Sequence, residues 1–356
     1  MPSGTYTVAD LQQITDQTAA SFGLDAIAAT LRNDLAAFNA VLDSMVSELA
    51  TPTTERQENY GASDDSEDMQ RADEFDRGVA VKLGAVATVG YPLYKYQRGV
   101  GWTHDYMLQN TPAQIANTVI GIQQRYSRAT RRELQLALFS PTNVTVRDSF
   151  VAPQIDLAVK RLVNADSQPI PNGPNGEVFD AATHTHYDWL NSTAPTEAAL
   201  LAAINDVVEH GHGGQVRLNI NQAAETAVRG MASFVAYFAG SLNPASTTIT
   251  ADGTLDTTRQ TNRPIGVLNG AEVWVRSWVP AGYVLTYDTA DPMKPLAYRQ
   301  HPIAAARGLR IVAQNADYPL YSEMLAGYFG FGVKTRTNGH VLYYASGAAA
   351  YVAPTL

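Results

Sequence analysis

Two short histidine pairs are the residues of this sequence best suited to chemistry. His184 and His186 lie two residues apart in the stretch THTHYDW, and His210 and His212 repeat that spacing with Glu209 beside them. Residues two apart in a strand point to the same side, so each pair could supply two ligands to zinc, iron or manganese. Such a pair is typical of a metal-dependent hydrolase.

The rest of the sequence does not supply what such a hydrolase needs. Only 170 of the 356 residues follow His186, whereas the eight-stranded βα barrel that carries such a pair takes about 250 residues. A small β-barrel oxygenase would need a glutamate just after the pair, and residues 187–191 offer only Asp188. We therefore predict no catalytic residue, no cofactor and no metal. The rings of His184 and His186, the metal candidates, are expected to bond to the backbone or to Asp180 and Asp188.

The second histidine pair is better explained as the end of a helix. Residues 195–210 have the composition of a helix, and a glycine follows both His210 and His212. Glycine permits the left-handed turn that ends many helices, and histidine suits the negative helix end. Other catalytic motifs are absent: there is no Gly-x-Ser-x-Gly elbow, no phosphate loop and no His-Glu-x-x-His, and the glycines of GYFGFG are in the wrong order for a dinucleotide turn.

Composition narrows the class of protein further. A net charge of -9 argues against a protein that reads nucleic-acid sequence. The absence of cysteine excludes disulfides, zinc-thiolate sites and thiol catalysis. The first basic residue is Arg32, and the most apolar run, MASFVAYFAG, is shorter than the ~20 residues of a membrane helix. We therefore expect a soluble protein made in the cytoplasm without a signal peptide.

Two long helices are predicted in the first 140 residues. Residues 24–49 carry apolar side chains at spacings of three and four, a stripe that needs a partner, and a shorter helix begins before them at a Thr7 cap. Thr111 and Pro112 start the second long helix. Because the next proline is Pro141, this helix can run for nearly thirty residues.

A positive flank lies along the second long helix. Arg125, Arg128 and Arg132 are spaced by three and four positions, with Arg131 nearby. This flank is either a solvated face paired with Glu133 and neighbouring carboxylates or a contact for a polyanion.

Residues 51–108 form a long excursion between the two helices. Residues 55–76 contain nine acidic side chains and little to bury, and the later stretch YPLYKYQRGVGWT is aromatic and strand-like. A segment of this size is too long for a simple connection inside a compact domain. We predict a two-limbed extended loop.

The second half of the chain mixes helices and strands. Residues 150–295 predict a helix over 195–210, a strand at QVRLNI, a helix over 223–238 and a meander of strands over 264–288 with a tight turn at Asn269-Gly270. Alternating runs on both sides of Asn338-Gly339 predict a further β-hairpin near the C-terminus.

The order of these segments resembles the major capsid proteins of tailed bacteriophages, whose fold is usually named after phage HK97. Specific stretches resemble them too, and the resemblance covers the chain from about residue 51. The stretches are VGYPLYKYQRGVGWT, RELQLALFSPTN, VNADSQPIPNGPNGEVFDAATHTHYDWL, EHGHGGQVRLNIN and GYFGFGVKTRTNGHVLYY.

The resemblance implies an α+β fold of the HK97-like type with five parts. These are an N-terminal helical arm (1–50), an extended loop (51–110), a peripheral domain with the spine helix (111–149), an axial α/β domain (150–295) and further β-strands of the peripheral domain (296–356). Residues expected at the subunit interface are Glu55, Glu58, Asp64, Asp65, Tyr91, Tyr94 and Trp102. The resemblance also implies that Arg125, Arg128, Arg131 and Arg132 face the lumen and DNA.

The function implied is that of a non-enzymatic subunit of an icosahedral virus capsid, which self-assembles into pentamers and hexamers and encloses double-stranded DNA. Its partners would be copies of itself, portal and scaffolding or decoration proteins, and DNA held without sequence specificity, with no cofactor and no membrane. Its location would be the virion, after assembly in the host cytoplasm. The alternatives are the shell of an encapsulin-like nanocompartment or gene-transfer particle, and a metal-dependent hydrolase using His184 and His186.

Overall fold

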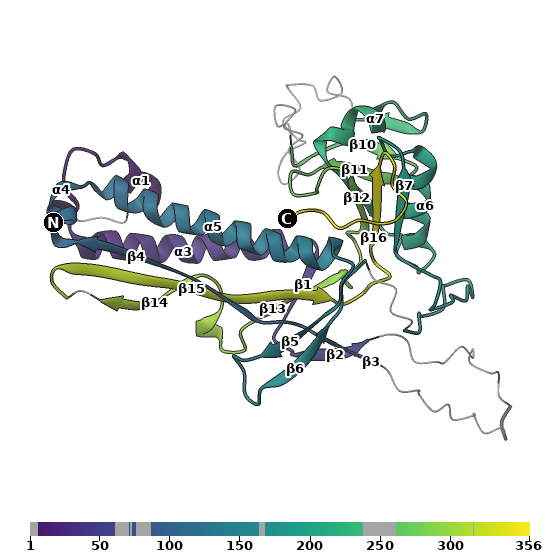
Figure 1. Cartoon of the computed structure of the whole chain (residues 1–356), viewed down its shortest axis with the longest axis horizontal. Coiled ribbons are helices and arrows are strands. Elements are labelled where there is room, and N and C mark those ends of the chain that lie inside the picture. The colour runs from purple at the N-terminus through teal and green to yellow at the C-terminus, as the bar shows by residue number, and fades with distance from the viewer. Residues whose placement is uncertain are drawn as a thin grey trace.

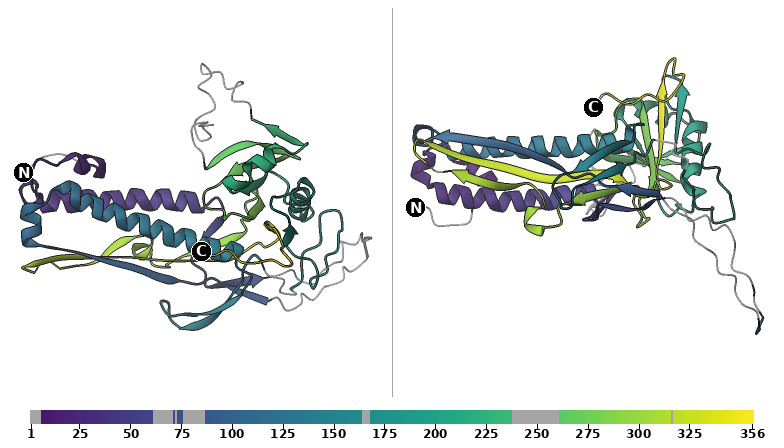
Figure 2. Two further views of the ribbon diagram at one scale, coloured as in Figure 1. Left: turned by 45° about the horizontal axis from the view of Figure 1, so that its top comes forward. Right: turned by 60° about the horizontal axis from the view of Figure 1, so that its bottom comes forward.

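The computed structural model describes residues 6–60, 71, 73–75, 87–163, 168–237, 261–315 and 317–356. Two long helices run side by side along an elongated body, with a sheet beside them, and a second sheet with its own helices lies at one end (Figure 1). Two further views show the same arrangement (Figure 2). This mixture of helices and sheets confirms the predicted α+β class.

The long helices form where the sequence predicts them. Helix α5 (Pro112–Phe139) begins with Pro112 in its first turn and a capping box, in which the Thr111 N–H donates to Gln114 Oε1 at 3.0 Å. Its apolar stripe packs against helix α3 (Leu24–Val46) and against the adjacent sheet. The shorter helices at this end are α1 (Val8–Gln13), α2 (Ala19–Phe22) and α4 (His104–Gln109). Helix α1 has the predicted Thr7 cap.

The first sheet has five strands and supports the long helices. Its order is β1-β13-β15-β14, with β4 also paired to β15. The bounds are β1 (Ala50–Thr53), β4 (Tyr94–Thr103), β13 (Leu296–Gln300), β14 (Arg310–Asn315) and β15 (Leu320–Val333). Strands β4 and β15 pair over ten residues, from Leu320 opposite Thr103 to Phe329 opposite Tyr94. The later limb of the predicted extended loop therefore pairs within its own chain.

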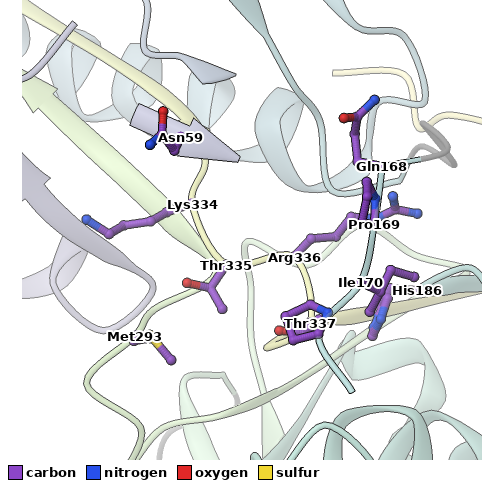
Figure 3. Close-up of a pocket in the computed structure, with 11 residues that line it drawn as sticks. Asn59, Gln168, Pro169, Ile170, His186, Met293, Lys334, Thr335, Arg336 and Thr337 are labelled. Carbon is purple, nitrogen blue, oxygen red and sulfur yellow. The ribbon is translucent and has the colours of Figure 1, made fainter. Parts of the chain in front are cut away.

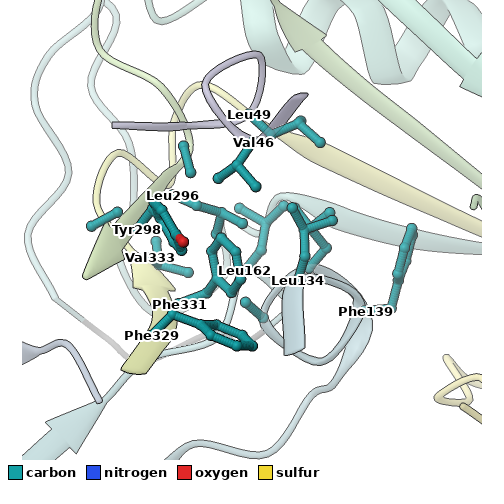
Figure 4. Close-up of a cluster of buried hydrophobic side chains, with 14 of the residues drawn as sticks. Val46, Leu49, Leu134, Phe139, Leu162, Leu296, Tyr298, Phe329, Phe331 and Val333 are labelled. Carbon is teal, nitrogen blue, oxygen red and sulfur yellow. The ribbon is translucent and has the colours of Figure 1, made fainter. Parts of the chain in front are cut away.

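The largest core cluster lies where the long helices meet this sheet. Figure 4 shows aromatic and aliphatic side chains from α3, α5 and strands β13 and β15 packed together. Tyr126 of α5 meets Phe329 of β15 edge-to-face, with the ring centroids 5.3 Å apart. Residues 157–163 join this cluster through Leu162 and Val163, both fully buried. Burial of this apolar surface is the main force that holds the helices to the sheet.

Glycines in GYFGFG allow the backbone of β15 to approach its neighbours. A Cβ placed on Gly330 would lie 2.2 Å from the carbonyl oxygen of Pro92, which is a backbone atom that cannot move aside. The motif therefore serves packing, since a side chain at this position has no room.

We expect Gly330→Ala to lower the free energy of unfolding by about 1–3 kcal/mol, the usual cost of overpacking. Gly121→Ala is the matched control, because nothing lies within 4 Å of a Cβ at that position in the middle of α5. There alanine should instead stabilise the helix by about 0.5–1 kcal/mol. Urea unfolding followed by circular dichroism compares the two variants, and equal effects would contradict the packing role of Gly330.

The second sheet has seven strands in the order β7-β16-β12-β8-β11-β10-β9. The bounds are β7 (Tyr187–Asn191), β8 (Val216–Ile220), β9 (Phe234–Ala236), β10 (Arg263–Leu268), β11 (Ala271–Val275), β12 (Tyr283–Asp288) and β16 (His340–Ala345). Helix α6 (Glu197–Val208) packs on it and buries Leu200, Ala203 and Val207. The turn predicted at Asn269-Gly270 is confirmed, because both residues have positive φ (47° and 85°) and join β10 to β11.

Two predicted elements of this region are wrong. Strand β8 lies between β11 and β12, so the predicted meander does not form. The predicted helix over 223–238 is also shorter. It consists of a 3₁₀ turn (Gln222–Ala224) and helix α7 (Glu225–Arg229), and β9 follows. Helix α7 ends at Gly230, whose N–H donates to the carbonyls of Ala227 and Val228. The residues of β9 then take an extended conformation because they pair with β10.

The hairpin predicted at Asn338-Gly339 does not form, because β15 and β16 belong to different sheets. The Asn338 side chain is fully buried, where it accepts from the Asp288 N–H at 2.8 Å and donates to the Met293 carbonyl at 2.9 Å. These hydrogen bonds hold the segment that connects β15 of the five-stranded sheet to β16 of the seven-stranded sheet. Consequently residues 340–345 pair with β12 and β7 and do not complete the first sheet, which corrects the predicted division at 296–356.

Two small hairpins lie beside the first sheet. Strands β2 (Gln57–Tyr60) and β3 (Ala87–Gly90) pair with each other, and so do β5 (Val144–Asp148) and β6 (Ile155–Val159). The second hairpin crosses the boundary predicted between residues 149 and 150, so that boundary is wrong. A buried ionic group links these elements, because Asp148 Oδ2 accepts from Arg299 and Arg56, each at 2.8 Å.

A second ionic group ties the helical body to the seven-stranded sheet. The Glu48 carboxylate follows α3 and accepts from Arg217 on β8 at 2.6 Å and from the Tyr287 hydroxyl on β12 at 3.0 Å. It also pairs with Arg276, which follows β11. Both guanidinium groups stack on the ring of Trp274, at 4.6 and 4.3 Å from its centroid. One carboxylate therefore bridges the two parts of the fold.

Candidate functional site

Three histidines from two distant segments meet at the seven-stranded sheet. His184 and His186 lie just before β7, and His210 lies just after α6. The Nε2 atoms of His184 and His210 are 2.9 Å apart, and one ring nitrogen from each of the three residues falls within 4.8 Å of the others. This is the one group of three metal-type ligands found among the described residues. The sequence does not place His210 beside the first pair.

The local structure explains why His210 points at the cluster. Gly211 has φ of +84°, and its N–H donates to the Val208 carbonyl at 2.9 Å, which confirms the predicted helix end. This turn ends α6 and directs the His210 side chain to the strand-entry segment of His184 and His186. The Phe179 ring lies against both His184 and His210, with centroid distances of 4.7 and 4.1 Å.

The hydrogen bonds expected for the first pair are not those observed. Asp180 accepts from the Ala182 N–H and the Thr183 hydroxyl, and Asp188 accepts from the Trp189 N–H. Among the described residues neither carboxylate bonds to His184 or His186. The Glu209 carboxylate lies beside two of the rings, with Oε1 at 3.5 Å from His184 Nε2 and 3.9 Å from His210 Nε2. The prediction of Asp180 and Asp188 as partners was therefore wrong.

Burial keeps these imidazoles neutral. It lowers the pKa of His186 well below its usual value, and neighbouring His210 and His340 lower it further. Burial also lowers the pKa of His210, to about 4. Burial lowers the pKa of His184 as well, although the negative charge of Glu209 raises it in part. The rings therefore present lone pairs at neutral pH.

The remaining histidines of this region have different surroundings. Both nitrogens of His212 are satisfied, with Nδ1 at 2.6 Å from Asp291 Oδ2 and Nε2 at 2.9 Å from Thr337 Oγ1. His210 and His212 therefore do not act as a pair. His340 is buried on β16 with its Nδ1 at 3.0 Å from Asp206 Oδ2.

A cavity of about 290 Å³ borders His186 (Figure 3). Its walls come from β2, from residues 168–171 and from residues 334–337, so it lies between the small hairpin and the seven-stranded sheet. The lining carries Lys334 and Arg336, and no carboxylate among the residues that line it. The residues that line this cavity therefore do not include the pair of carboxylates that general acid and base catalysis would use.

The predicted interface residues differ in burial. Tyr91 and Trp102 are 0% and 6% exposed, so these side chains serve the subunit's own core and are corrected as interface candidates. Glu58 accepts from the Tyr91 hydroxyl at 3.1 Å and pairs with Lys334 at 3.2 Å, while Tyr94 is half-buried on β4. Glu55 is exposed and stays a prediction. Asp64 and Asp65 lie outside the described residues.

The arginine flank of α5 is open to solvent. Arg125, Arg128, Arg131 and Arg132 are all exposed. Glu133 does not pair with them but accepts from the Tyr96 hydroxyl at 2.7 Å. In the described part of the chain none of the four arginines forms a hydrogen bond or ion pair. The flank is thus a concentration of uncompensated positive charge on an acidic protein.

No protein-family model and no curated protein matches the sequence. A structure of Mycobacterium phage Patience matches with a TM-score of 0.68 and 24% identity, covering 99% of this chain and 96% of that chain. The holo-SrpI encapsulin complex from Synechococcus elongatus has a TM-score of 0.45 and 13% identity, covering 84% and 86%. The capsid of an empty GTA particle has a TM-score of 0.44 and 13% identity, covering 84% and 89%. The match to the phage structure confirms the HK97-like fold that the resemblance implied.

Proposed function

We propose that this chain is the structural subunit of an icosahedral virus capsid, which assembles into pentamers and hexamers and encloses double-stranded DNA in the virion. The observation that carries the proposal is the fold shared with a bacteriophage structure over 99% of the chain. None of the described helices is long and apolar enough to cross a membrane.

The parts of the fold would make different contacts in the shell. The five-stranded sheet and α5 form the peripheral part, and the seven-stranded sheet with α6 forms the axial part, which would meet its copies around the five-fold and six-fold centres. The helical arm and the extended loop would contact neighbouring subunits. Exposed apolar side chains in both segments support such contacts. On helix α3, Val41 and Met45 are 61% and 64% exposed, and in the extended loop Phe75 is 92% exposed. Large apolar side chains left in water favour association.

Negative-stain electron microscopy of the chain expressed alone tests this function. Closed shells of uniform diameter with five-fold and six-fold features are the expected result, whereas isolated monomers at high concentration would contradict it. Nuclease-resistant DNA inside particles purified with the other viral proteins would favour the virus over a nanocompartment, in which protein cargo would replace DNA. Portal and scaffolding or decoration proteins are the further partners that we propose for such particles.

We expect the arginine flank to hold DNA at the inner wall of the shell. Replacing Arg125, Arg128, Arg131 and Arg132 by glutamine should leave assembly intact and lower DNA retention as salt rises. The slope of log affinity against log salt should fall by about 0.9 for each phosphate that the variant no longer neutralises. The measurement is the DNA retained by purified particles over a sodium chloride series.

Arg147→Gln together with Arg229→Gln is the control for this prediction. Arg147 pairs with Asp156 at 3.2 Å and Arg229 with Glu225 at 2.8 Å, so both arginines already have a carboxylate partner. This control should keep the salt dependence of the wild type. An unchanged slope in the four-fold variant would show that the flank faces away from the DNA.

A further inference from the structure

We propose that His184, His186, His210 and Glu209 bind one divalent transition-metal ion, with zinc as the ion that the ligand set fits best. Three imidazoles and one carboxylate are a four-ligand set of the kind that zinc takes in proteins. Imidazole ligands favour zinc, copper or nickel over magnesium and calcium, which prefer oxygen.

His186 supplies the observation that points to a ligand. The residue is 1% exposed, and neither of its ring nitrogens has a hydrogen-bond partner in the described part of the chain. A buried polar group without a partner is costly, and native proteins seldom keep one. An ion between the rings would give His186 a partner that the surrounding side chains do not provide.

The distances suit a metal ion after small rotations of the rings. Zinc lies about 2.0–2.1 Å from imidazole nitrogens, so two ligands of a tetrahedral site are about 3.3–3.4 Å apart. The Nε2 atoms of His184 and His210 are 2.9 Å apart, and one ring nitrogen of each of the three histidines lies within 4.8 Å of the others. The required spacing falls between these values.

The electrostatics also favour a cation. Glu209 brings negative charge next to the rings, with its Oε1 at 3.5 Å from His184 Nε2 and 3.9 Å from His210 Nε2. Arg336 acts in the opposite direction, because its charge lowers the pKa values of His184 and His186.

The site would have a structural role. Its ligands come from the segment before β7 and from the end of α6, so the ion would clip that segment to the helix. The Phe179 ring lies against His184 and His210, and His186 is buried, while the side chains of His184 and Glu209 are 18% and 33% exposed, so the ion would be partly shielded from water. Closed four-ligand sites are typical of structural zinc. This inference does not depend on the shell function.

Metal content tests the proposal directly. The full-length chain is stripped with chelator, dialysed against zinc chloride and freed of loose metal, and zinc is measured by mass spectrometry. We expect about one zinc per chain in the wild type and in the control His104→Gln, whose residue is exposed on α4. His184→Gln should bind zinc at least tenfold more weakly. Equal binding by His184→Gln and the wild type, or no zinc in the wild type, would overturn the proposal.

Two further measurements keep the test valid if a variant folds poorly. His184 and Glu209 are partly exposed, so His184→Gln and Glu209→Gln should fold, and circular dichroism checks this. The wild type loaded with Co²⁺ should show the intense visible absorption of a tetrahedral site with nitrogen ligands. Only the weak bands of octahedral, aqueous cobalt would count against the site regardless of any variant.

Discussion

Replacing Asp148 by alanine is expected to lower the free energy of unfolding by about 3–5 kcal/mol. Asp148 and Arg299 are both 0% exposed, and their ion pair measures 2.8 Å. Without the carboxylate, the Arg299 guanidinium keeps its 2.7 Å bond to the Tyr91 carbonyl but loses its buried counter-charge. Arg56, from the loop between β1 and β2, would lose the same partner. The measurement is denaturant unfolding of dilute subunit.

Asp156→Ala is the matched control, because Asp156 belongs to the same small hairpin and pairs with Arg147 at the surface. The two side chains of that pair are 62% and 54% exposed, so its loss should change stability by about 0–1 kcal/mol. The double variant Asp148→Ala with Arg299→Met should recover much of the loss, since apolar residues can replace a buried ion pair. Similar losses in Asp148→Ala and Asp156→Ala would contradict the assigned role.

Shortening the extended loop is expected to abolish large particles while the subunit still folds. Tyr60 pairs with Ala87 at the end of the β2–β3 hairpin. Residues 61–86 can therefore be replaced by Asn-Gly, which closes a two-residue hairpin turn. The β2–β3 pairing and both main sheets lie outside the deletion. Because many copies of one weak interaction hold a shell together, removing that interaction from every subunit should act on assembly far more than on folding.

Sedimentation and circular dichroism distinguish the two effects of the deletion. We expect a native spectrum together with monomers or single rings. Phe75→Ser is a milder variant that removes the exposed aromatic side chain alone, and it should raise the concentration needed for assembly at least tenfold. Shells of normal size from the deletion variant would show that the loop is not the docking element.

Local patterns predicted the two long helices well because the signals lie within a few residues. The cap and proline at Thr111-Pro112 and the spacing of apolar residues set the bounds of α5, and Asn269-Gly270 set a tight turn. The same dipeptide at Asn338-Gly339 was misleading. There the asparagine side chain is buried by contacts with Asp288 and Met293, which lie about fifty residues earlier in the chain. A local pattern cannot reveal such a contact.

Strand order and the histidine cluster depended on contacts between distant segments. Strand β8 is inserted between β11 and β12, and the sequence near those strands carries no sign of it. The sequence explained His210 well enough as the end of a helix. The pairing of β7 with β16 brings the first histidine pair, which lies just before β7, next to the sheet on which α6 packs. The signal available in the sequence was the repeated His-x-His spacing with Glu209 beside one pair.

Sedimentation velocity of the purified wild-type chain over a hundredfold range of concentration tests the central claim most directly. On the proposed function, the stable form of this protein is a shell of many copies. We predict a discrete boundary many times heavier than the 38.4 kDa chain, persisting on dilution. A single boundary at 38.4 kDa at every concentration, from protein with a native spectrum, would contradict it.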